Sequence, residues 1–391
     1  MRYRIDPISG NKLSVLGFGC MRFPRSRNKI DLGKSEQLLL EAIDRGVNYF
    51  DTAYVYGGSE EAVGEILFRN KVRDRIFLAT KLPHQNCKES SDFDSLFETQ
   101  LERLKTDRID YYLIHNIATT EAWQRLCSLG IEQWIEQKKA AGRIGRIGFS
   151  FHGAQKDYLD LLDAYDWEFT QIQYNYMDEN YQAGRAGLQK AHAKGLPVII
   201  MEPLLGGKLA HGLPATAEHI FKGIDPHMTP ASWALRWLFN QPEVTVVLSG
   251  MNSPEQLLDN LETAEAVGVG DLKHQEVFPL VKKAIEESYK VPCTGCNYCM
   301  PCPNGVNIPG CFSAYNKSFA MGFMAGIQQY LTSTGMTSPA ENHAASRCTR
   351  CGACEKKCPQ NIPISSELKA VAKRMEPFWL SAALKIFMKL R

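Results

Sequence analysis

Four side chains in the first third of the chain are of the types that can protonate a carbonyl oxygen: Asp51, Tyr56, Lys81 and His115. A phenol has an ordinary pKa near ~10 and is a poor acid at neutral pH. A neighbouring ammonium lowers that pKa by stabilising the phenolate, and a carboxylate can hold the ammonium in place. We therefore expect Tyr56 to donate the proton, with Lys81 and Asp51 behind it. His115 would orient the carbonyl group, and a cofactor must supply the hydride because no side chain does.

A second set of reactive side chains is crowded towards the C-terminus. Nine of the 12 cysteines follow residue 290. Crowding at one end of an otherwise ordinary chain favours metal binding over a disulfide framework. The later run has the spacing Cys348-x2-Cys351-x2-Cys354-x3-Cys358-Pro. This spacing predicts a 4Fe–4S cluster, because the two-residue gaps let three thiolates of one turn reach three irons.

The earlier run is Cys293-x2-Cys296-x2-Cys299-x2-Cys302-Pro, and its last gap is one residue shorter. In two-cluster proteins with this spacing the fourth cysteine ligates the other cluster. We therefore expect two 4Fe–4S clusters with crossed ligands. One cluster would be held by Cys293, Cys296, Cys299 and Cys358, and the other by Cys348, Cys351, Cys354 and Cys302. A zinc site needs only four thiolates, so eight in two quartets argue against zinc.

One further cysteine of this region, Cys311, is left over by this scheme. We interpret it as a buried thiol, and the alternative is that it replaces Cys302 as a ligand. The remaining three cysteines, Cys20, Cys87 and Cys127, are interpreted as small apolar core residues.

Short β-branched runs alternate with longer amphipathic segments between residue 13 and about residue 250. The predicted strands are 15–19, 47–52, 76–81, 110–115, 146–150, 170–174, 197–201 and 244–249. The predicted helices are 35–45, 60–69, 92–104, 122–141, 155–165 and 184–194. Gly46, Gly142 and Gly195 stand where three of these helices should end. Eight strand–helix units in about 250 residues predict a closed (β/α)8 TIM barrel rather than an open sheet.

The barrel prediction explains why the four candidate side chains should meet. Catalytic residues of such barrels lie at the C-terminal ends of the strands, where the variable loops begin. Asp51, Lys81 and His115 stand at the ends of three consecutive predicted strands, and Tyr56 follows Asp51 by five residues. We therefore expect all four on one rim.

The pattern changes near residue 282, and we predict a barrel domain over 1–282 and a second domain over 283–391. The stretch between the two cysteine runs has a helical pattern, so the second domain should be small and mainly α-helical. A short apolar and basic helix is predicted at 377–391.

Composition excludes several classes of protein. Hydrophobic residues make up 44% of the 391 residues and charged residues 23%, as in globular proteins with an ordinary core. A net charge of +2 implies no basic field for nucleic acid. We find no secretion signal and no transmembrane segment. Reduced thiols point to a cytoplasmic protein.

The residues from 13 to about 265 resemble the aldo-keto reductase family. The resemblance rests on all four candidate side chains at family-like spacing, on Gln171, and on three motifs: Leu16-Gly17-Phe18-Gly19, the run from Asn48 to Gly57, and Ile147-Gly148-Phe149-Ser150. It implies a small carbonyl or alcohol substrate and an NAD(P)H cofactor extended over the rim. Ser150 and Gln171 would lie near its carboxamide. The residues implied at its adenine and phosphate end are Ser249, Gly250, Gln256 and Asn260.

Departures from the family pattern leave the choice between NADH and NADPH open. Phe151 stands where the family has asparagine, and Met201 replaces the tyrosine expected to stack on the nicotinamide. The loop after the eighth predicted strand, 249–253, has no Arg or Lys to meet a 2′-phosphate.

Residues 290–365 resemble the α-helical ferredoxin module of redox-complex subunits. Three hypotheses follow for the whole chain. In the first, the chain is a carbonyl reductase whose clusters exchange electrons with the active site or with a redox partner protein. In the second, it is an NAD(P)H reductase whose clusters are structural or sense oxidation. In the third, it is an electron-transfer protein whose barrel is mainly a docking scaffold. A hydride carries two electrons and a cluster accepts one, so electron transfer from a nicotinamide to a cluster needs a converter such as a flavin. The sequence has no clear flavin motif, and a bound flavin is not excluded.

Overall fold

The computed structural model describes residues 1–27, 29–266, 268–320, 323–336 and 342–380. The chain divides into two compact units. We call residues 1–210 and 228–275 the barrel unit, and residues 211–227 and 276–391 the cysteine unit. Most of the helix predicted at 377–391 lies outside the described residues. Among those that are described, no helix has the length and apolar character needed to cross a bilayer.

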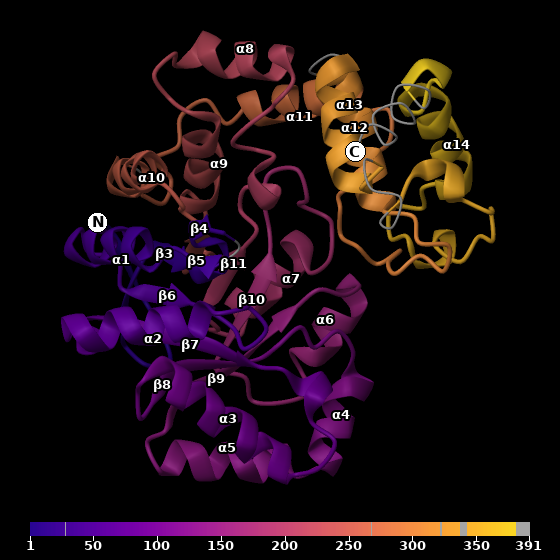
Figure 1. The fold of residues 1–391 in the computed structure, drawn as a ribbon. Coiled ribbons are helices and arrows are strands. Elements are labelled where there is room, and N and C mark those ends of the chain that lie inside the picture. The colour runs from indigo at the N-terminus through magenta and orange to yellow at the C-terminus, as the bar shows by residue number, and fades with distance from the viewer. Residues whose placement is uncertain (28, 267, 321–322, 337–341, 381–391) are drawn as a thin grey trace. The chain divides into compact units, whose positions relative to one another are not determined.

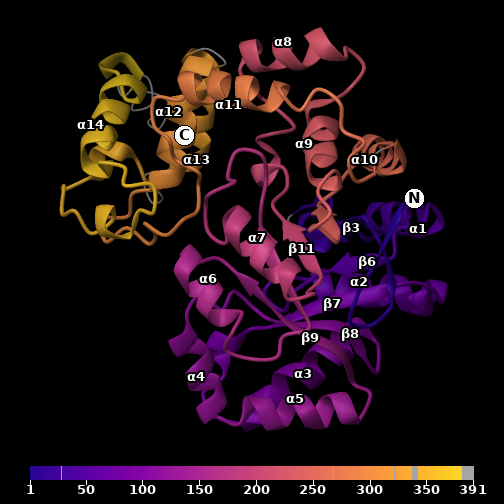
Figure 2. The same cartoon turned by 180° about the vertical axis from the view of Figure 1, so that it is seen from behind.

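The barrel unit is built on eight parallel strands in the closed order β10-β11-β12-β3-β6-β7-β8-β9 (Figures 1 and 2). The prediction of an eight-stranded barrel is confirmed. The strands are β3 (Leu16–Gly19), β6 (Tyr49–Asp51), β7 (Phe77–Leu82), β8 (Ile109–Ile114), β9 (Ile144–Phe151), β10 (Phe169–Gln173), β11 (Val198–Met201) and β12 (Val246–Ser249).

Large aromatic side chains fill part of the barrel interior. Tyr111 contacts both Tyr49 and Phe169, with ring centroids 5.3 and 5.1 Å apart. These rings pack edge to face, an arrangement that aromatic pairs favour. The hydroxyl of Tyr111 donates to Asp6 Oδ2 at 2.7 Å, which ties the barrel to the N-terminal hairpin of β1 (Tyr3–Ile5) and β2 (Lys12–Ser14).

Helices follow the strands, as the alternating pattern predicts. They are α1 (Leu32–Asp44), α2 (Ser59–Asn70), α3 (Ser91–Leu104), α4 (Thr120–Ser128), α5 (Ile131–Ala140), α6 (Gln155–Leu161), α7 (Gly184–Ala193), α9 (Pro230–Phe239) and α10 (Pro254–Ala266). The single helix predicted at 122–141 was wrong. Gly130 has a φ of +84°, and this left-handed residue separates α4 from α5.

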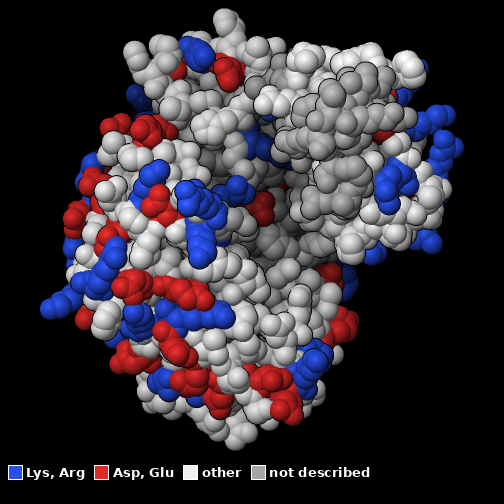
Figure 3. Space-filling view, in the orientation of Figure 1, with Lys and Arg blue, Asp and Glu red and all other residues white. Residues whose placement is uncertain are grey.

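Charges of both signs are interspersed on the lower face of the barrel unit, over α3 and α5 (Figure 3). Lys138 Nζ lies 2.6 Å from Asp94, and Arg143 Nη2 lies 2.8 Å from Glu98. This face therefore carries no extended field of a single sign.

The cysteine unit is mainly helical, as predicted. Its helices are α8 (Ala215–Ile224), α11 (Val277–Ser288), α12 (Ile308–Ala320), α13 (Phe323–Thr334) and α14 (Ile364–Met375). Its apolar core includes Phe312, Tyr330 and Val371, and six of the cysteines from the two runs pack against or within that core. The two cysteine-bearing loops are therefore supported by one set of packed helices.

Candidate active site and cysteine loops

The barrel strands bring the four predicted side chains to one rim. Asp51 is the last residue of β6, Lys81 is the fifth residue of β7, and His115 follows β8 directly. The register pairs Leu82 with Ile114, so β7 and β8 end together, and it pairs Asp51 with Ala79, three residues before the end of β7. Tyr56 lies in the loop between β6 and α2.

Lys81 and Asp51 form a buried ion pair at the centre of this group. The ammonium Nζ lies 2.5 Å from Asp51 Oδ1, and it also donates to the carbonyl oxygen of Thr52 at 2.7 Å. The amide of Gln171 donates to the second carboxylate oxygen of Asp51 at 2.8 Å. Both oxygens of Asp51 therefore have a partner, which is what a buried carboxylate needs.

Tyr56 and His115 complete the group. Lys81 Nζ lies 5.2 Å from the centroid of the Tyr56 ring. The rings of Tyr56 and His115 are nearly perpendicular, with centroids 6.1 Å apart. Both residues are partly exposed, whereas Lys81 and Asp51 are buried. The phenol and the imidazole are therefore the members that a substrate can reach.

The electrostatics differ in one respect from the sequence prediction. Burial raises the pKa of Tyr56, and Lys81 offsets only part of that rise, so the expected net lowering of this pKa was wrong. Burial opposes the charged form of Lys81, but Asp51 and Tyr56 outweigh it and raise the pKa of Lys81. Burial and the charge of Lys81 lower the pKa of His115 to about 3. His115 is therefore neutral at physiological pH.

The residues implied at the nicotinamide cofactor occupy the same rim and are held by hydrogen bonds. Ser150 Oγ accepts from the backbone N–H of Asn116 at 2.8 Å, and Gln171 is engaged with Asp51. Asn260 Nδ2 donates to Ser249 Oγ at 2.7 Å, and both of these side chains are buried. Gln256 Oε1 accepts from the backbone N–H of Asn252 at 3.0 Å, at the start of α10.

Arg22 is a cation on this rim that the sequence analysis missed. It ends a short 3-10 helix (Cys20–Arg22) directly after β3. A Cβ atom placed on Gly250 would lie 3.2 Å from both Cβ and Cδ of Arg22. A Cβ atom placed on Gly206 would lie 3.4 Å from Nη2 of Arg22. Its side chain thus runs over the start of the loop after β12 towards the loop after β11. It is exposed and has no hydrogen bond or ion pair within the described residues.

The phosphate site of many (β/α)8 barrels is formed by the loops after the seventh and eighth strands. Here those strands are β11 and β12, and Arg22 from the loop after β3 lies beside both loops. Residues 249–253 themselves contain no cation. The first and eighth strands of a closed barrel are neighbours. A cation shortly after the first strand, such as Arg22, can therefore serve the loop after the eighth strand.

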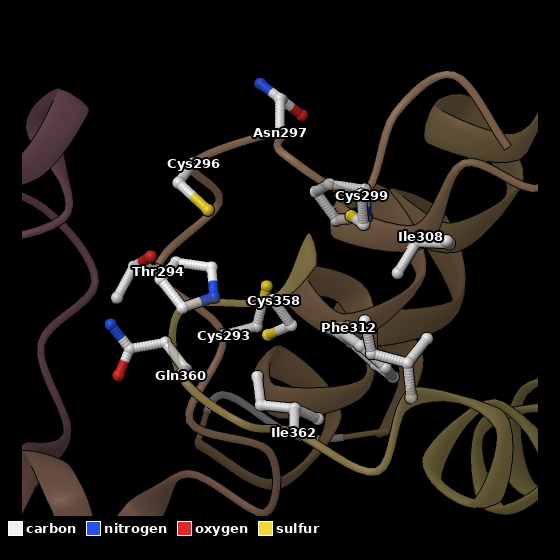
Figure 4. Close-up of a pocket in the computed structure, with 13 residues that line it drawn as sticks. Cys293, Thr294, Cys296, Asn297, Cys299, Ile308, Phe312, Cys358, Gln360 and Ile362 are labelled. Atoms are coloured by element: carbon white, nitrogen blue, oxygen red, sulfur yellow. The ribbon is translucent and has the colours of Figure 1, made fainter. Parts of the chain in front are cut away.

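Four cysteines from the two runs line one cavity in the cysteine unit, namely Cys293, Cys296, Cys299 and Cys358 (Figure 4). Apolar side chains close its other walls, among them Ile308, Phe312 and Ile362. Burial and the charges of Cys293 and Cys296 raise the pKa of Cys299 to about 12. Four thiols in an apolar cavity are a donor set that suits an iron–sulfur cluster.

A second group forms around Cys354. Burial and the charges of Glu355, Cys348 and Cys302 raise its pKa, although a backbone hydrogen bond opposes this. Asn304 Nδ2 lies 3.9 Å from Cys351 Sγ and donates to Thr349 Oγ1 at 2.8 Å.

The two cysteine loops share an unusual backbone conformation. In the first, Gly295 and Asn297 have φ values of +75° and +66°. In the second, the equivalent positions, two and four residues after the first cysteine, are Arg350 at +60° and Gly352 at +72°. Left-handed residues at both matching positions identify the two runs as copies of one loop structure.

Cys311 is the remaining cysteine of this unit. It is fully buried in α12, and its Sγ lies 3.9 Å from the carbonyl oxygen of His343. It does not line the cavity of Figure 4.

Two family models match consecutive parts of the chain. The Aldo/keto reductase family matches residues 15–271, and the 4Fe-4S dicluster domain matches residues 292–362. An aldo-keto reductase of Mycolicibacterium vanbaalenii is 29% identical over 257 residues, which cover 64% of this chain and 83% of that protein.

Two solved structures have the same barrel fold. An aldo-keto reductase of Bacillus halodurans in its holo form gives a TM-score of 0.60 at 24% identity, covering 73% of this chain and 96% of that one. An aldo-keto reductase of Klebsiella pneumoniae in complex with NADPH gives 0.58 at 24% identity, covering 73% and 95%.

Proposed function

Because this chain belongs to the aldo/keto reductase family, we propose that it uses NAD(P)H to reduce a small aldehyde or ketone, or to oxidise the corresponding alcohol, on the rim that carries Tyr56. The observation that carries the proposal is the buried Lys81–Asp51 pair beside Tyr56 and His115. The substrate is a small carbonyl compound or alcohol.

Each side chain has a distinct part in this chemistry. His115 is neutral, so the one N–H of its imidazole donates a hydrogen bond to the carbonyl oxygen and orients it. Tyr56 Oη gives its proton to that oxygen. Lys81 stabilises the phenolate left behind, and Asp51 holds the ammonium in place. The bound nicotinamide supplies the hydride.

The rim also suits a dinucleotide cofactor. Gly250 presents no side chain, and beside the loops after β11 and β12 lies the guanidinium of Arg22, which has no hydrogen bond or ion pair with the residues that the structure describes. Guanidinium groups bind phosphates through charge-assisted hydrogen bonds. We assign to Arg22 the positive charge that the loop 249–253 lacks, with Ser249, Gln256 and Asn260 on the adenine side.

The test is a pair of tyrosine variants. Tyr56→Phe removes the proton donor, whereas Tyr54→Phe alters a neighbouring tyrosine whose ring stacks on Arg103. NADPH- and NADH-driven reduction of a panel of small aldehydes should fall by about a hundredfold or more in Tyr56→Phe and persist in the control. Reduction that survives the loss of the Tyr56 hydroxyl would refute this role.

For the cysteine unit we propose two 4Fe–4S clusters with crossed ligands. Cys293, Cys296 and Cys299 hold the first together with Cys358, with which they share one cavity. Cys348, Cys351 and Cys354 hold the second together with Cys302. The left-handed residues at matching positions support two equivalent loops. Each cluster would carry one electron.

A cluster-deficient variant tests whether the clusters serve turnover. Cys351→Ser with Cys354→Ser removes two ligands of the second cluster. If NAD(P)H-driven turnover is unchanged, the clusters are structural; if turnover or its coupling to an electron acceptor is lost, they carry electrons. A flavin assay on the purified protein tests for a converter between hydride and one-electron chemistry.

A further inference from the structure

The two cysteine loops match in backbone but differ sharply in charge. Residues 292–303 around the first run contain no charged residue. Residues 347–357 around the second contain four cations and one carboxylate, with the cations at Arg347, Arg350, Lys356 and Lys357. Both loops have left-handed residues at the same two positions relative to their cysteines. The arrangement of the cysteines therefore does not require these cations.

Arg350 is the most informative of the four. It has a φ of +60° at the position where the first loop has glycine with a φ of +75°. Glycine adopts this left-handed region without strain, whereas a side chain there carries a small energetic cost. The second loop therefore keeps a cation where its own repeat shows that glycine is suitable.

The charged loop is also where a cluster ligand reaches the surface. Cys351 follows Arg350 directly and is exposed, unlike the other seven predicted ligands, which are buried or partly buried. Arg347 Nε donates to the carbonyl oxygen of Asn304, whose side chain contacts Thr349 and approaches Cys351. The guanidinium group of Arg347 therefore contacts the same residue, Asn304, that approaches the exposed ligand.

Two carboxylates lie at this loop, and both accept from backbone N–H groups. Glu355 accepts from Ser365 in the first turn of α14, and Glu376 accepts from Ser346, directly before the loop. None of the four cations forms a salt bridge with any residue that the structure describes. Figure 3 shows Lys and Arg with few Asp or Glu over the edge of the cysteine unit that carries α14 and its preceding loop.

We propose that the loop 347–357 is the docking surface for an acidic one-electron carrier protein of the ferredoxin class. The inference rests on the proposed second cluster. A carrier must approach a cluster closely, and the exposed Cys351 marks that approach. Complementary charge steers such encounters and sets their salt dependence. One electron passes from the reduced carrier cluster to the oxidised cluster of this chain, and no bond or proton is exchanged.

The test uses the full-length, cluster-loaded chain and a purified acidic bacterial ferredoxin as the probe. The dissociation constant is measured anaerobically by calorimetry at low and high salt, and stopped-flow absorption follows electron transfer. Arg350→Gly removes one charge and matches the glycine of the first loop, so the loop should still fold. Lys283→Gln on α11 removes the same charge from an exposed site elsewhere in the unit.

Binding should weaken as salt rises, and Arg350→Gly should weaken it about threefold or more at low salt with unchanged iron content. Lys283→Gln should bind like the wild type. The inference is overturned by salt-independent binding, by wild-type affinity in Arg350→Gly, or by equal affinity for single-stranded RNA. A wild-type chain without iron or a reduced-cluster EPR signal would instead refute the proposed clusters.

Discussion

The ammonium of Lys81 lies 2.5 Å from Oδ1 of Asp51, and the two side chains are only 1% and 5% exposed. A buried pair of this kind contributes little net stability over an apolar pair of the same volume, but loss of one partner leaves an unpaired charge. Replacing either residue of the pair should therefore change both the free energy of unfolding of the barrel and the reaction at its rim.

Lys81→Met should lower the free energy of unfolding by about 3–5 kcal/mol, because Asp51 loses its counter-charge inside the barrel. Carbonyl reduction should fall by about a hundredfold or more, because no cation remains to stabilise the Tyr56 phenolate. Urea unfolding and steady-state kinetics measure the two effects. The double variant Lys81→Met/Asp51→Asn should regain part of the stability and none of the activity; recovery of activity would contradict the proposed role of Lys81.

His115 should make the protein sensitive to acid. Its pKa is about 3 in the folded chain against an ordinary 6.5, so between these values the unfolded chain binds more protons. The stability that the neutral imidazole provides is therefore complete above pH 6.5 and is lost as the pH falls towards 3. Between about pH 7 and about pH 5, the wild type should lose more unfolding free energy than His115→Gln, by at most about 1.4 kcal/mol per pH unit. Parallel losses would show that His115 does not titrate in this way.

Arg22→Ala should weaken cofactor binding by about tenfold or more, because a phosphate loses a charge-assisted partner. Fluorescence titration with NADPH and with NADH measures the effect. Equal weakening would indicate contact with the pyrophosphate that both share, and weakening of NADPH alone would indicate contact with the 2′-phosphate. Arg27→Ala, in the exposed turn between β4 (Arg25–Ser26) and β5 (Lys29–Ile30), serves as the control, and unchanged affinity in Arg22→Ala would remove this residue from the site.

Cys302 and Cys311 should respond differently to substitution. The full-length protein should hold about eight iron atoms per chain if both clusters form. Cys311→Ala should keep this iron content, because the thiol is fully buried in α12 and does not line the cavity of the first cysteine group. Cys302→Ala should lose iron from the second cluster. Iron analysis with EPR of the reduced protein distinguishes the two, and the opposite result would make Cys311 the ligand.

Much of the barrel could be predicted from local pattern. All eight strands were expected within about two residues of their observed ends, because parallel barrel strands are apolar runs separated by helix signals. Strand ends also placed Asp51, Lys81 and His115 on one rim. Local pattern was weaker between α4 and α5, where a helical periodicity continues across Gly130 although the backbone turns there.

The sequence by itself determined the types of chemistry available. Cysteine spacing predicts cluster binding because neighbouring thiolates must reach one cube, and strand order brings Tyr56 near Lys81 because consecutive barrel strands are adjacent. Only the tertiary structure decided which distant groups meet. Gln171 reaches Asp51 across 120 positions, and Arg22 lies against Gly250. Such contacts depend on barrel closure and on the packing of loops over helices, and no local pattern encodes either of them.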